Sequence, residues 1–165
     1  MLDVEIRFAR PTDVEAIDAL IRELAEYERL SHQVIANQQQ LRDALFSATP
    51  HVYCHVVEEE HTIVGFALWF LTFSTFEGAT GLYLEDLYVR ESHRRQGIGA
   101  SLLQRLAALC VERGYTRLQW WVLDWNEPSI EFYRSFGAVP MDEWTVYRVS
   151  GEALRKLSSA TASDL

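Results

Sequence analysis

The segment that decides the fold is Val89-Arg90-Glu91-Ser92-His93-Arg94-Arg95-Gln96-Gly97-Ile98-Gly99-Ala100. An apolar strand pattern precedes it and a helical pattern follows, so it joins a β-strand to a helix through a loop with two glycines. Such a loop directs several backbone N–H groups to one point, where the helix dipole adds positive charge. Its spacing is neither G-x-x-x-x-G-K-[ST] nor G-x-G-x-x-G, which disfavours nucleoside triphosphate and dinucleotide chemistry. We interpret it as an anion-binding loop; the alternative is an ordinary junction with solvated arginines.

The charge of the chain supports the anion-binding interpretation. The 165 residues carry a formal net charge of −9, with 24 acidic and 15 basic residues. Three arginines against one glutamate give the loop +2, so the remainder carries −11. An acidic remainder favours a cationic partner and argues against nucleic acid and anionic membranes, which need a basic face. Solubility is the alternative explanation of the acidity.

Outward from the loop, hydrophobic periodicity predicts the order β-α-α-β-β-β-α-β-α-β. The predicted strands are residues 4–8, 51–58, 62–73, 82–89, 117–123 and 144–149. Helices are predicted after Pro11, near Asn37, over 97–113, and from a cap at Asn126 to Gly137. This order gives an α+β fold: a mixed, mostly antiparallel twisted sheet, helices on both faces, and one right-handed β-α-β crossover.

The loop also resembles a known signature. Arg94-x-x-Gly97-x-Gly99 fits the [RQ]-x-x-G-x-[GA] pattern of the GNAT superfamily of N-acetyltransferases. Three further runs, at residues 24–28 (LAEYE), 83–89 (YLEDLYV) and 125–133 (WNEPSIEFY), resemble the diamine (spermidine/spermine) acetyltransferases. The resemblance implies direct transfer of an acetyl group from acetyl-CoA to a primary amine of a small diamine or polyamine.

Cofactor contacts follow from the resemblance. It implies that the strand lines the acetyl–pantetheine arm, that the loop binds the phosphates, and that the next helix start also contacts CoA. The residues concerned are Leu87, Tyr88, Val89, Arg94, Arg95, Gln96, Gly97, Ile98, Gly99, Ala100, Asn126, Glu127, Pro128 and Ser129. Asn126 and Ser129 are also good helix caps whatever the function.

Two catalytic roles are expected. An alkylammonium has a pKa of about 10.4, so the site must remove a proton before the amine attacks. Glu85 and Asp86 interrupt an apolar strand, where acids are depleted. With the resemblance, Glu85 is the candidate base, acting through water, and Asp86 is second; the alternative is an edge-strand acid in water or paired with arginine. The family places its general acid at Tyr133, which periodicity alone would make a core tyrosine.

The resemblance also implies a set of substrate contacts: Tyr27, Glu28, Glu85, Asp86, Gln119, Trp120 and Trp121. Glu28 would recognise a distal ammonium, and an aromatic face can hold an alkylammonium by cation–π attraction. The alternatives are a solvated helix end for Tyr27 and Glu28, and a core position for one of the two adjacent tryptophans.

The remaining expectations concern the chain as a whole. Its histidines and its cysteines, Cys54 and Cys110, show no metal-ligand spacing, so no metal is expected. Without a signal segment or an apolar run of about 20 residues, a cytoplasmic protein is expected. We expect one catalytic domain over residues 1–157, a disordered tail over 158–165, and a homodimer. The open alternatives are a lysine-analogue acceptor, a peptide acceptor, and an acyl-CoA sensor without turnover.

Overall fold

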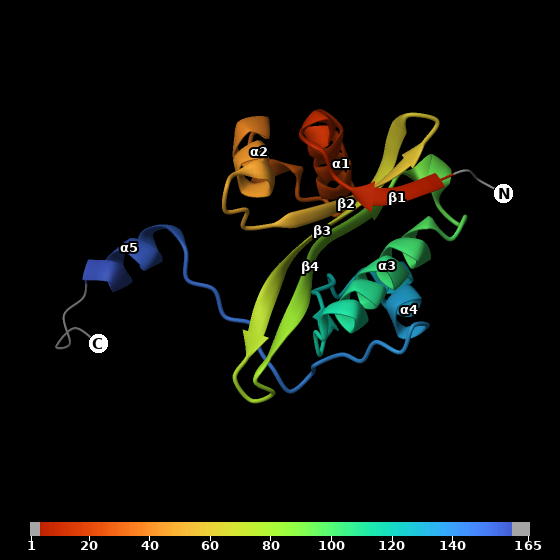
Figure 1. Cartoon of the computed structure of the whole chain (residues 1–165). Helices are drawn as coiled ribbons and strands as arrows, with labels where there is room; N and C mark the ends of the chain where they lie inside the picture. The colour runs from red at the N-terminus through yellow and green to blue at the C-terminus, as the bar shows by residue number, and fades with distance from the viewer. Residues whose placement is uncertain (1–3, 160–165) are drawn as a thin grey trace. The chain divides into compact units, whose positions relative to one another are not determined.

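A five-stranded sheet with the strand order β1-β2-β3-β4-β5 organises the first part of the chain (Figure 1). The computed structural model describes residues 4–159. The chain divides into two units, the first ending at Trp121 and the second beginning at Val122. The strands are β1 (Val4–Phe8), β2 (Tyr53–Glu59), β3 (Thr62–Ser74), β4 (Ala79–Val89) and β5 (Leu118–Gln119). Neighbours are antiparallel except β4 and β5, which run parallel across α3 (Ile98–Arg113). The predicted mixed, mostly antiparallel sheet with one β-α-β crossover is confirmed.

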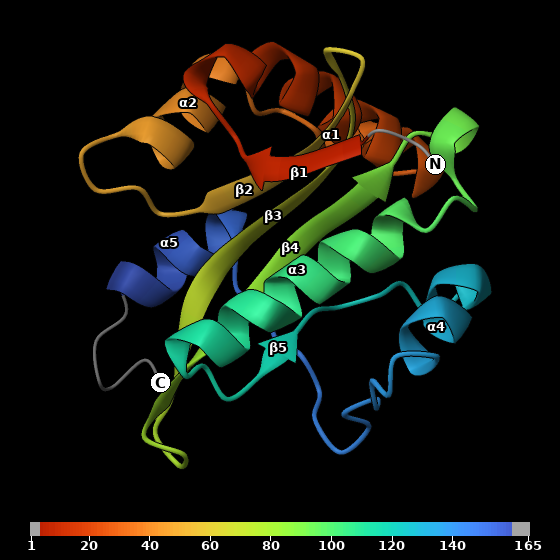
Figure 2. The same cartoon turned by 45° about the vertical axis from the view of Figure 1, so that its right-hand side comes forward.

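Helices cover both faces of this sheet (Figure 2). Helices α1 (Val14–Tyr27) and α2 (Gln38–Phe46) lie on one face, and α3 lies on the other. Side chains of α1, α2, β2, β3 and β4 form one apolar core: Ile17, Leu20, Leu45, Cys54, Val56, Ile63, Phe66, Leu68 and Tyr88. Short 3₁₀ helices complete the first unit: η1 (Pro11–Asp13), η2 (Ser31–Gln33) and η3 (Glu91–His93).

Local sequence explains where these elements end. Glu60 and His61 both have positive φ, as a two-residue hairpin between β2 and β3 requires. The Asn37 side chain accepts a hydrogen bond from the Gln40 backbone in a capping box at α2. Gly114 ends α3 in the left-handed conformation, with φ of 68°. The turn after β2 and the end of α3 agree, to within one residue, with the strands predicted over 51–58 and 62–73 and with the helix predicted over 97–113.

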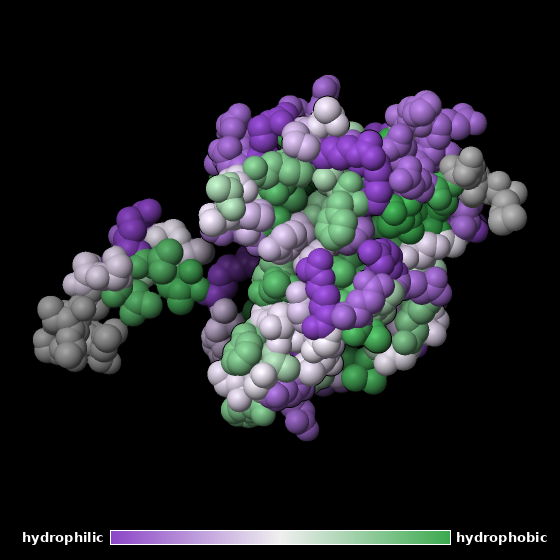
Figure 3. All heavy atoms as spheres, viewed as in Figure 1, coloured by the Kyte–Doolittle hydropathy of each residue, from purple (hydrophilic) through white to green (hydrophobic). Residues whose placement is uncertain are grey.

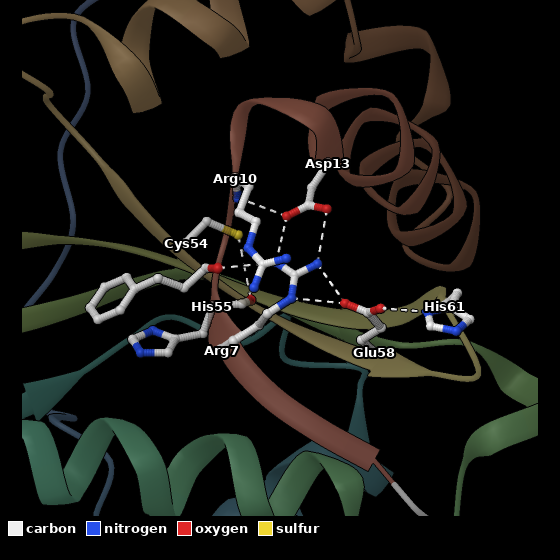
Figure 4. A network of polar contacts seen from close by, with 8 residues as sticks. Arg7, Arg10, Asp13, Cys54, His55, Glu58 and His61 are labelled. Atoms are coloured by element: carbon white, nitrogen blue, oxygen red, sulfur yellow. Dashed lines mark hydrogen bonds and ion pairs between the residues drawn. The ribbon is translucent and has the colours of Figure 1, made fainter.

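A cluster of charged side chains fastens β1 to α1 and β2 (Figure 4). The Arg7 guanidinium pairs with Asp13 at 2.7 Å and with Glu58 at 2.6 Å, and the Arg10 backbone N–H donates to Asp13 at 2.7 Å. The hydrogen bond to Asp13 contributes most to raising the pKa of Arg7. Burial alone would raise the pKa of Asp13, but the bonds from Arg7 and Arg10 outweigh it and lower that pKa. We call Arg7, Asp13 and Glu58 the ion-pair cluster.

A buried histidine, His55, lies on β2 beside β3. Trp69 Nε1 donates to His55 Nδ1 at 3.1 Å, and the Phe8 ring lies 4.2 Å from the imidazole. Burial, assisted by the positive charges of Arg105 and Arg113 on α3, lowers the pKa of His55 to about 4. His55 is therefore a neutral core residue at physiological pH.

The second unit contains α4 (Glu127–Arg134) and α5 (Gly151–Ser159). The predicted strand over 144–149 is wrong, because residues 144–150 have no regular structure. The predicted strand over 117–123 is too long, since β5 covers two residues. Alternating apolar residues favour an extended chain, but a strand also needs a partner with which to share hydrogen bonds. Residues 158 and 159 of the predicted tail belong to α5, and 160–165 lie outside the described residues.

Candidate functional site

The loop between β4 and α3 has the geometry of an anion-binding junction. Arg95 and Gly97 have positive φ, of 61° and 81°, and Gly97 is the N-cap of α3. No side chain in the described part of the chain caps α3, so its first N–H groups receive no side-chain acceptor. A Cβ built on Gly97 would meet nothing within 4 Å, so the backbone there faces open space. Arg95 and Gln96 are exposed beside it.

The edge of β4 that leads into this loop is open. Strand β5 pairs with β4 only at Leu82 and Tyr83. From residue 84 to Val89, that edge of β4 has no strand partner within residues 4–159. The backbone N–H and C=O groups that face this edge, those of Leu87 among them, can therefore bond a ligand as an added strand would. The open edge and the loop form one continuous row of backbone groups.

A β-bulge marks the acidic part of β4. Leu68 of β3 lies opposite Asp86, whereas Trp69 lies opposite Leu84, so Glu85 has no partner in β3. Such bulges re-aim side chains and are common beside functional sites. The alternation of inward and outward side chains along β4 is therefore interrupted at Glu85. The Glu85 side chain is exposed, whereas Asp86 is largely buried and lies opposite the core residue Leu68.

Three carboxyl groups come together at this bulge: Glu28, Glu85 and Asp86, which we call the acid cluster. Burial raises the pKa of Asp86, and together with the charges of Glu85 and Glu28, which act in the same direction, it brings that pKa to about 7. Burial also raises the pKa of Glu28, at the C-cap of α1. The Asp86 charge contributes, after burial, to raising the pKa of the Cys54 thiol, which makes that thiol unreactive. The structure thus brings together two acids of β4 and one of α1, far apart in sequence.

Most of the loop side chains turn away from the glycines. Arg94 Nε donates to the Val89 carbonyl at 3.0 Å, and its guanidinium lies over the rings of Tyr27, at 4.9 Å, and Tyr88, at 5.3 Å. Arg90 pairs with Glu23 of α1 at 3.1 Å. His93 pairs with Glu59 of β2 at 2.9 Å. The side chain of Arg94 therefore packs against α1, and its backbone N–H donates to the Glu91 carbonyl at 3.2 Å.

The remaining substrate candidates of the first unit lie around Tyr83. Gln119 pairs with Tyr83 across β4 and β5, and the Trp121 ring meets Tyr83 edge-on at 5.9 Å. Trp121 is 57% exposed, so it is not the core member of the tryptophan pair. Trp120 follows β5 directly.

The candidate cofactor-binding and catalytic residues around α4 lie in the second unit. Asn126 caps α4 and accepts from the Ser129 backbone N–H at 3.4 Å, with Glu127 and Pro128 in the first turn. Tyr133 lies near the other end of α4, with its ring 5.4 Å from that of Phe132. The structure thus groups the α4 candidates with one another, and groups the loop, β4 and α1 candidates with one another.

Sequence reasoning missed two acids that hold the loop, Glu23 and Glu59. Glu23 lies 67 positions before its partner Arg90, and nothing local in the sequence marks the pair. Within residues 4–159 there is no group of three or more His, Cys, Asp or Glu side chains that could hold a metal ion. The described helices also include none that is long and apolar enough to cross a membrane.

Comparisons with known proteins agree with this geometry. Residues 16–138 match the acetyltransferase (GNAT) family model. Thialysine N-epsilon-acetyltransferase of Bos taurus is 38% identical over 96% of this chain and 99% of its own length. Spermidine/spermine N(1)-acetyltransferase-like protein 1 of Homo sapiens is 33% identical over 91% of this chain, which spans 23% of that longer protein.

A solved structure shares the fold. An integron cassette protein from the mobile metagenome of V. cholerae superposes with a TM-score of 0.80, at 28% identity, over 97% of this chain and all of the other. The predicted N-acetyltransferase class is confirmed, because the family model and two acetyltransferase relatives match nearly the same residues. The chain belongs to the GNAT acetyltransferase family.

Proposed function

We propose that this protein transfers an acetyl group from acetyl-CoA to a primary amine of a small aliphatic polyamine, diamine or amino acid. One observation carries the proposal: the open edge of β4 runs into a glycine-containing helix start that no side chain caps, and two acids of the acid cluster, Glu85 and Asp86, lie on the same strand. The family match spans both units, which supports a single catalytic domain over residues 1–157.

The residues present fit acetyl-CoA. The backbone groups that Leu87 presents at the open edge suit the amide groups of the pantetheine arm, because amides pair with a strand edge, and Tyr88 and Val89 are proposed to line the same arm. The backbone N–H groups of residues 95–100 and the dipole of α3 suit the pyrophosphate, with Arg95 as the exposed cation. Asn126, Glu127, Pro128 and Ser129 at the start of α4 are proposed as further contacts. When bound, acetyl-CoA supplies the activated acetyl group.

The acid cluster suits the amine. Three carboxyl groups held together repel one another, and an ammonium group relieves that repulsion. Glu28 would bind a distal cationic group, and Glu85 the ammonium near the bulge. Tyr27, Gln119, Trp120 and Trp121 would line the acceptor, with Trp121 offering an exposed aromatic face.

The burial of the acids changes their expected roles. Sequence reasoning ranked Glu85 above Asp86 as the base. We propose Asp86 as the proton acceptor, because a carboxyl group whose pKa is about 7 takes a proton near neutral pH better than an ordinary one. The exposed Glu85 would bind the ammonium and pass its proton through water. Tyr133 would protonate the departing thiolate as the N–C bond forms and the C–S bond breaks.

The acceptor has two candidate classes, and named relatives favour both. A thialysine acetyltransferase supports an amino-acid amine, the alternative that the sequence left open. A spermidine/spermine acetyltransferase-like protein supports a polyamine. A polyamine gives the acid cluster two or more cations, whereas an amino-acid amine also brings a carboxylate, which the cluster repels. We therefore keep the polyamine or diamine as the first candidate.

A homodimer is proposed as the functional form. Exposed apolar side chains gather on the extended segment over 144–149, among them Trp144, Val146 and Tyr147. An extended segment of this kind can add to a strand of a second copy. Sedimentation of the protein would give the mass of two chains if the proposal holds, and of one chain if it does not.

The test is CoA release over a panel of amines: spermidine, putrescine, thialysine, ornithine and a lysine peptide. Amine-dependent release supports the proposal, and the preferred member assigns the acceptor class. Saturable acetyl-CoA binding without amine-dependent release would make the protein a sensor. A preference for the peptide would contradict a small-molecule acceptor.

A further inference from the structure

Five side chains join the phosphate loop to the last two turns of α1. We call them the α1 clamp: Glu23 and Tyr27 on the helix, Tyr88 on β4, Arg90 directly after β4, and Arg94 in the loop. Hydrophilic side chains gather over α1 and the β2–β3 hairpin (Figure 3).

Two parallel contacts make up the clamp. Glu23 and Tyr27 are four residues apart and share one face of α1. Arg90, four residues before Arg94, pairs with Glu23 at 3.1 Å, and Arg94 lies over the Tyr27 ring at 4.9 Å. Burial raises the pKa of Tyr88, the charge of Glu23 acts in the same direction, and Arg94 opposes it. Tyr88 is thus within electrostatic reach of both contacts.

The side chain of Arg94 makes one hydrogen bond and two ring contacts in this arrangement. Its Nε donates to the Val89 carbonyl at 3.0 Å while its guanidinium faces the rings of Tyr27 and Tyr88. Only arginine combines a planar cation for ring stacking with a donor directed along the stem. Tyr27 is the last residue of α1, and Glu28 of the acid cluster is its C-cap. Helix ends fray, so a contact at Tyr27 fixes where Glu28 lies.

We propose that Arg94 is a positioning residue for the amine: it holds the Tyr27 ring and so orients the Tyr27–Glu28 end of α1 toward the acceptor. This inference rests on the proposed function. The arginine of the loop signature would then affect amine recognition through α1, while the backbone of the same loop serves acetyl-CoA.

The experiment compares Arg94→Gln, Tyr27→Leu and the double variant. Glutamine is the other residue that the loop signature admits, so Arg94→Gln removes the cation and leaves the motif intact. We expect the amine KM to rise about five-fold, as the loss of a cation–π contact and one hydrogen bond implies, with acetyl-CoA Kd by calorimetry within about two-fold of wild type. Since both changes break one contact, the double variant should raise the amine KM less than the product of the single effects.

Three further variants make the result specific. Arg94→Lys keeps a cation over the ring but loses the planar group and the Nε donor, so its amine KM should lie between those of the wild type and Arg94→Gln. Arg22→Lys is the control, because Arg22 pairs with Asp18 on the outside of the same helix. Arg95→Gln should weaken acetyl-CoA binding with little change in the amine KM. Thermal unfolding of each variant checks that it is folded.

Two results would overturn the inference. In one, Arg94→Gln weakens acetyl-CoA binding and leaves the amine KM unchanged, which would make Arg94 a phosphate ligand. In the other, the effects of Arg94→Gln and Tyr27→Leu multiply, which would make them independent. A wild-type protein that binds acetyl-CoA and acetylates no amine contradicts the proposed function itself, and it appears before any variant is made.

Discussion

The ion-pair cluster and the acid cluster change the pKa of a buried carboxyl group in opposite directions. In the ion-pair cluster, Arg7 pairs with both Asp13 and Glu58, and the pKa of Asp13 falls. In the acid cluster, Asp86 is buried near Glu28 and Glu85, and its pKa rises to about 7. Paired charges hold one element against another, whereas carboxylates that repel one another are stabilised when a cationic ligand binds between them. The difference teaches that the protonation behaviour of a buried acid separates its structural role from a functional one.

The largest expected effect is on turnover at the acid cluster. Asp86→Asn removes the proposed proton acceptor, so kcat should fall by roughly 10²–10⁴-fold, the range for a positioned base. The protein should remain folded and bind acetyl-CoA normally. Steady-state CoA release and calorimetry measure these quantities. A kcat within a few-fold of wild type would remove Asp86 from the mechanism.

The same kind of substitution in the ion-pair cluster should change stability instead. Asp13→Asn leaves the buried Arg7 with Glu58 alone, and the free energy of unfolding should drop by about 2 kcal/mol. Asp18→Asn is the matched control, since Asp18 pairs with the half-exposed Arg22 and should change stability by less than about 0.5 kcal/mol. Urea unfolding gives both values. Turnover of the folded Asp13→Asn protein should equal wild type, and a large loss would end the distinction between the clusters.

The stability that the two clusters contribute should also change with pH in opposite directions. Asp86 has a raised folded-state pKa, so its contribution to stability is present below its ordinary pKa of 3.8 and is lost as pH rises through about 7. Asp13 has a lowered pKa, so its contribution is present above 3.8 and is lost as pH falls below it. Asp86→Asn should therefore be more stable than wild type at pH 8, by up to about 4 kcal/mol at about 1.4 kcal/mol per pKa unit, and close to it near pH 4. Urea unfolding at the two pH values decides, and a variant less stable at pH 8 would contradict the repulsion.

The smallest expected effect is at the outer edge of the acid cluster. Glu28→Gln removes the proposed contact with the distal cation, which is partly exposed to water and so contributes little. The KM for spermidine should rise about three-fold, with kcat unchanged. A monoamine such as butylamine provides the comparison, because it has no distal cation and its KM should stay the same. An equal rise for both amines would remove Glu28 from distal recognition.

How far the sequence predicts this molecule differs between its parts. The strand–loop–helix junction and the β2–β3 hairpin follow from local patterns, because each depends on a few consecutive residues. The length of β5 and the absence of a strand over 144–149 do not, since pairing depends on a partner elsewhere in the chain. The candidate site divides in the same way. Its acids could be named from the sequence, but the bulge at Glu85 that buries Asp86 and exposes its neighbour could not.

The contacts of the loop show the same limit. Arg90 and Arg94 were identified from their number and position as cations for an anion. Their partners, Glu23 and Tyr27, lie on α1, and only the folded chain brings them within reach. Local sequence thus identified the loop, and tertiary packing determines what its side chains do.

The pH dependence of kcat/KM for the preferred amine, measured for the wild type, Asp86→Asn and Glu85→Gln, tests the account most directly. For the wild type we expect a rise with pH that levels above an apparent pKa of about 7, because the ionised Asp86 is the active form. This rise, the acidic limb of the pH profile, should be missing from the residual activity of Asp86→Asn and present in Glu85→Gln. A limb near pH 7 that survives in Asp86→Asn, or that disappears only in Glu85→Gln, would contradict the account.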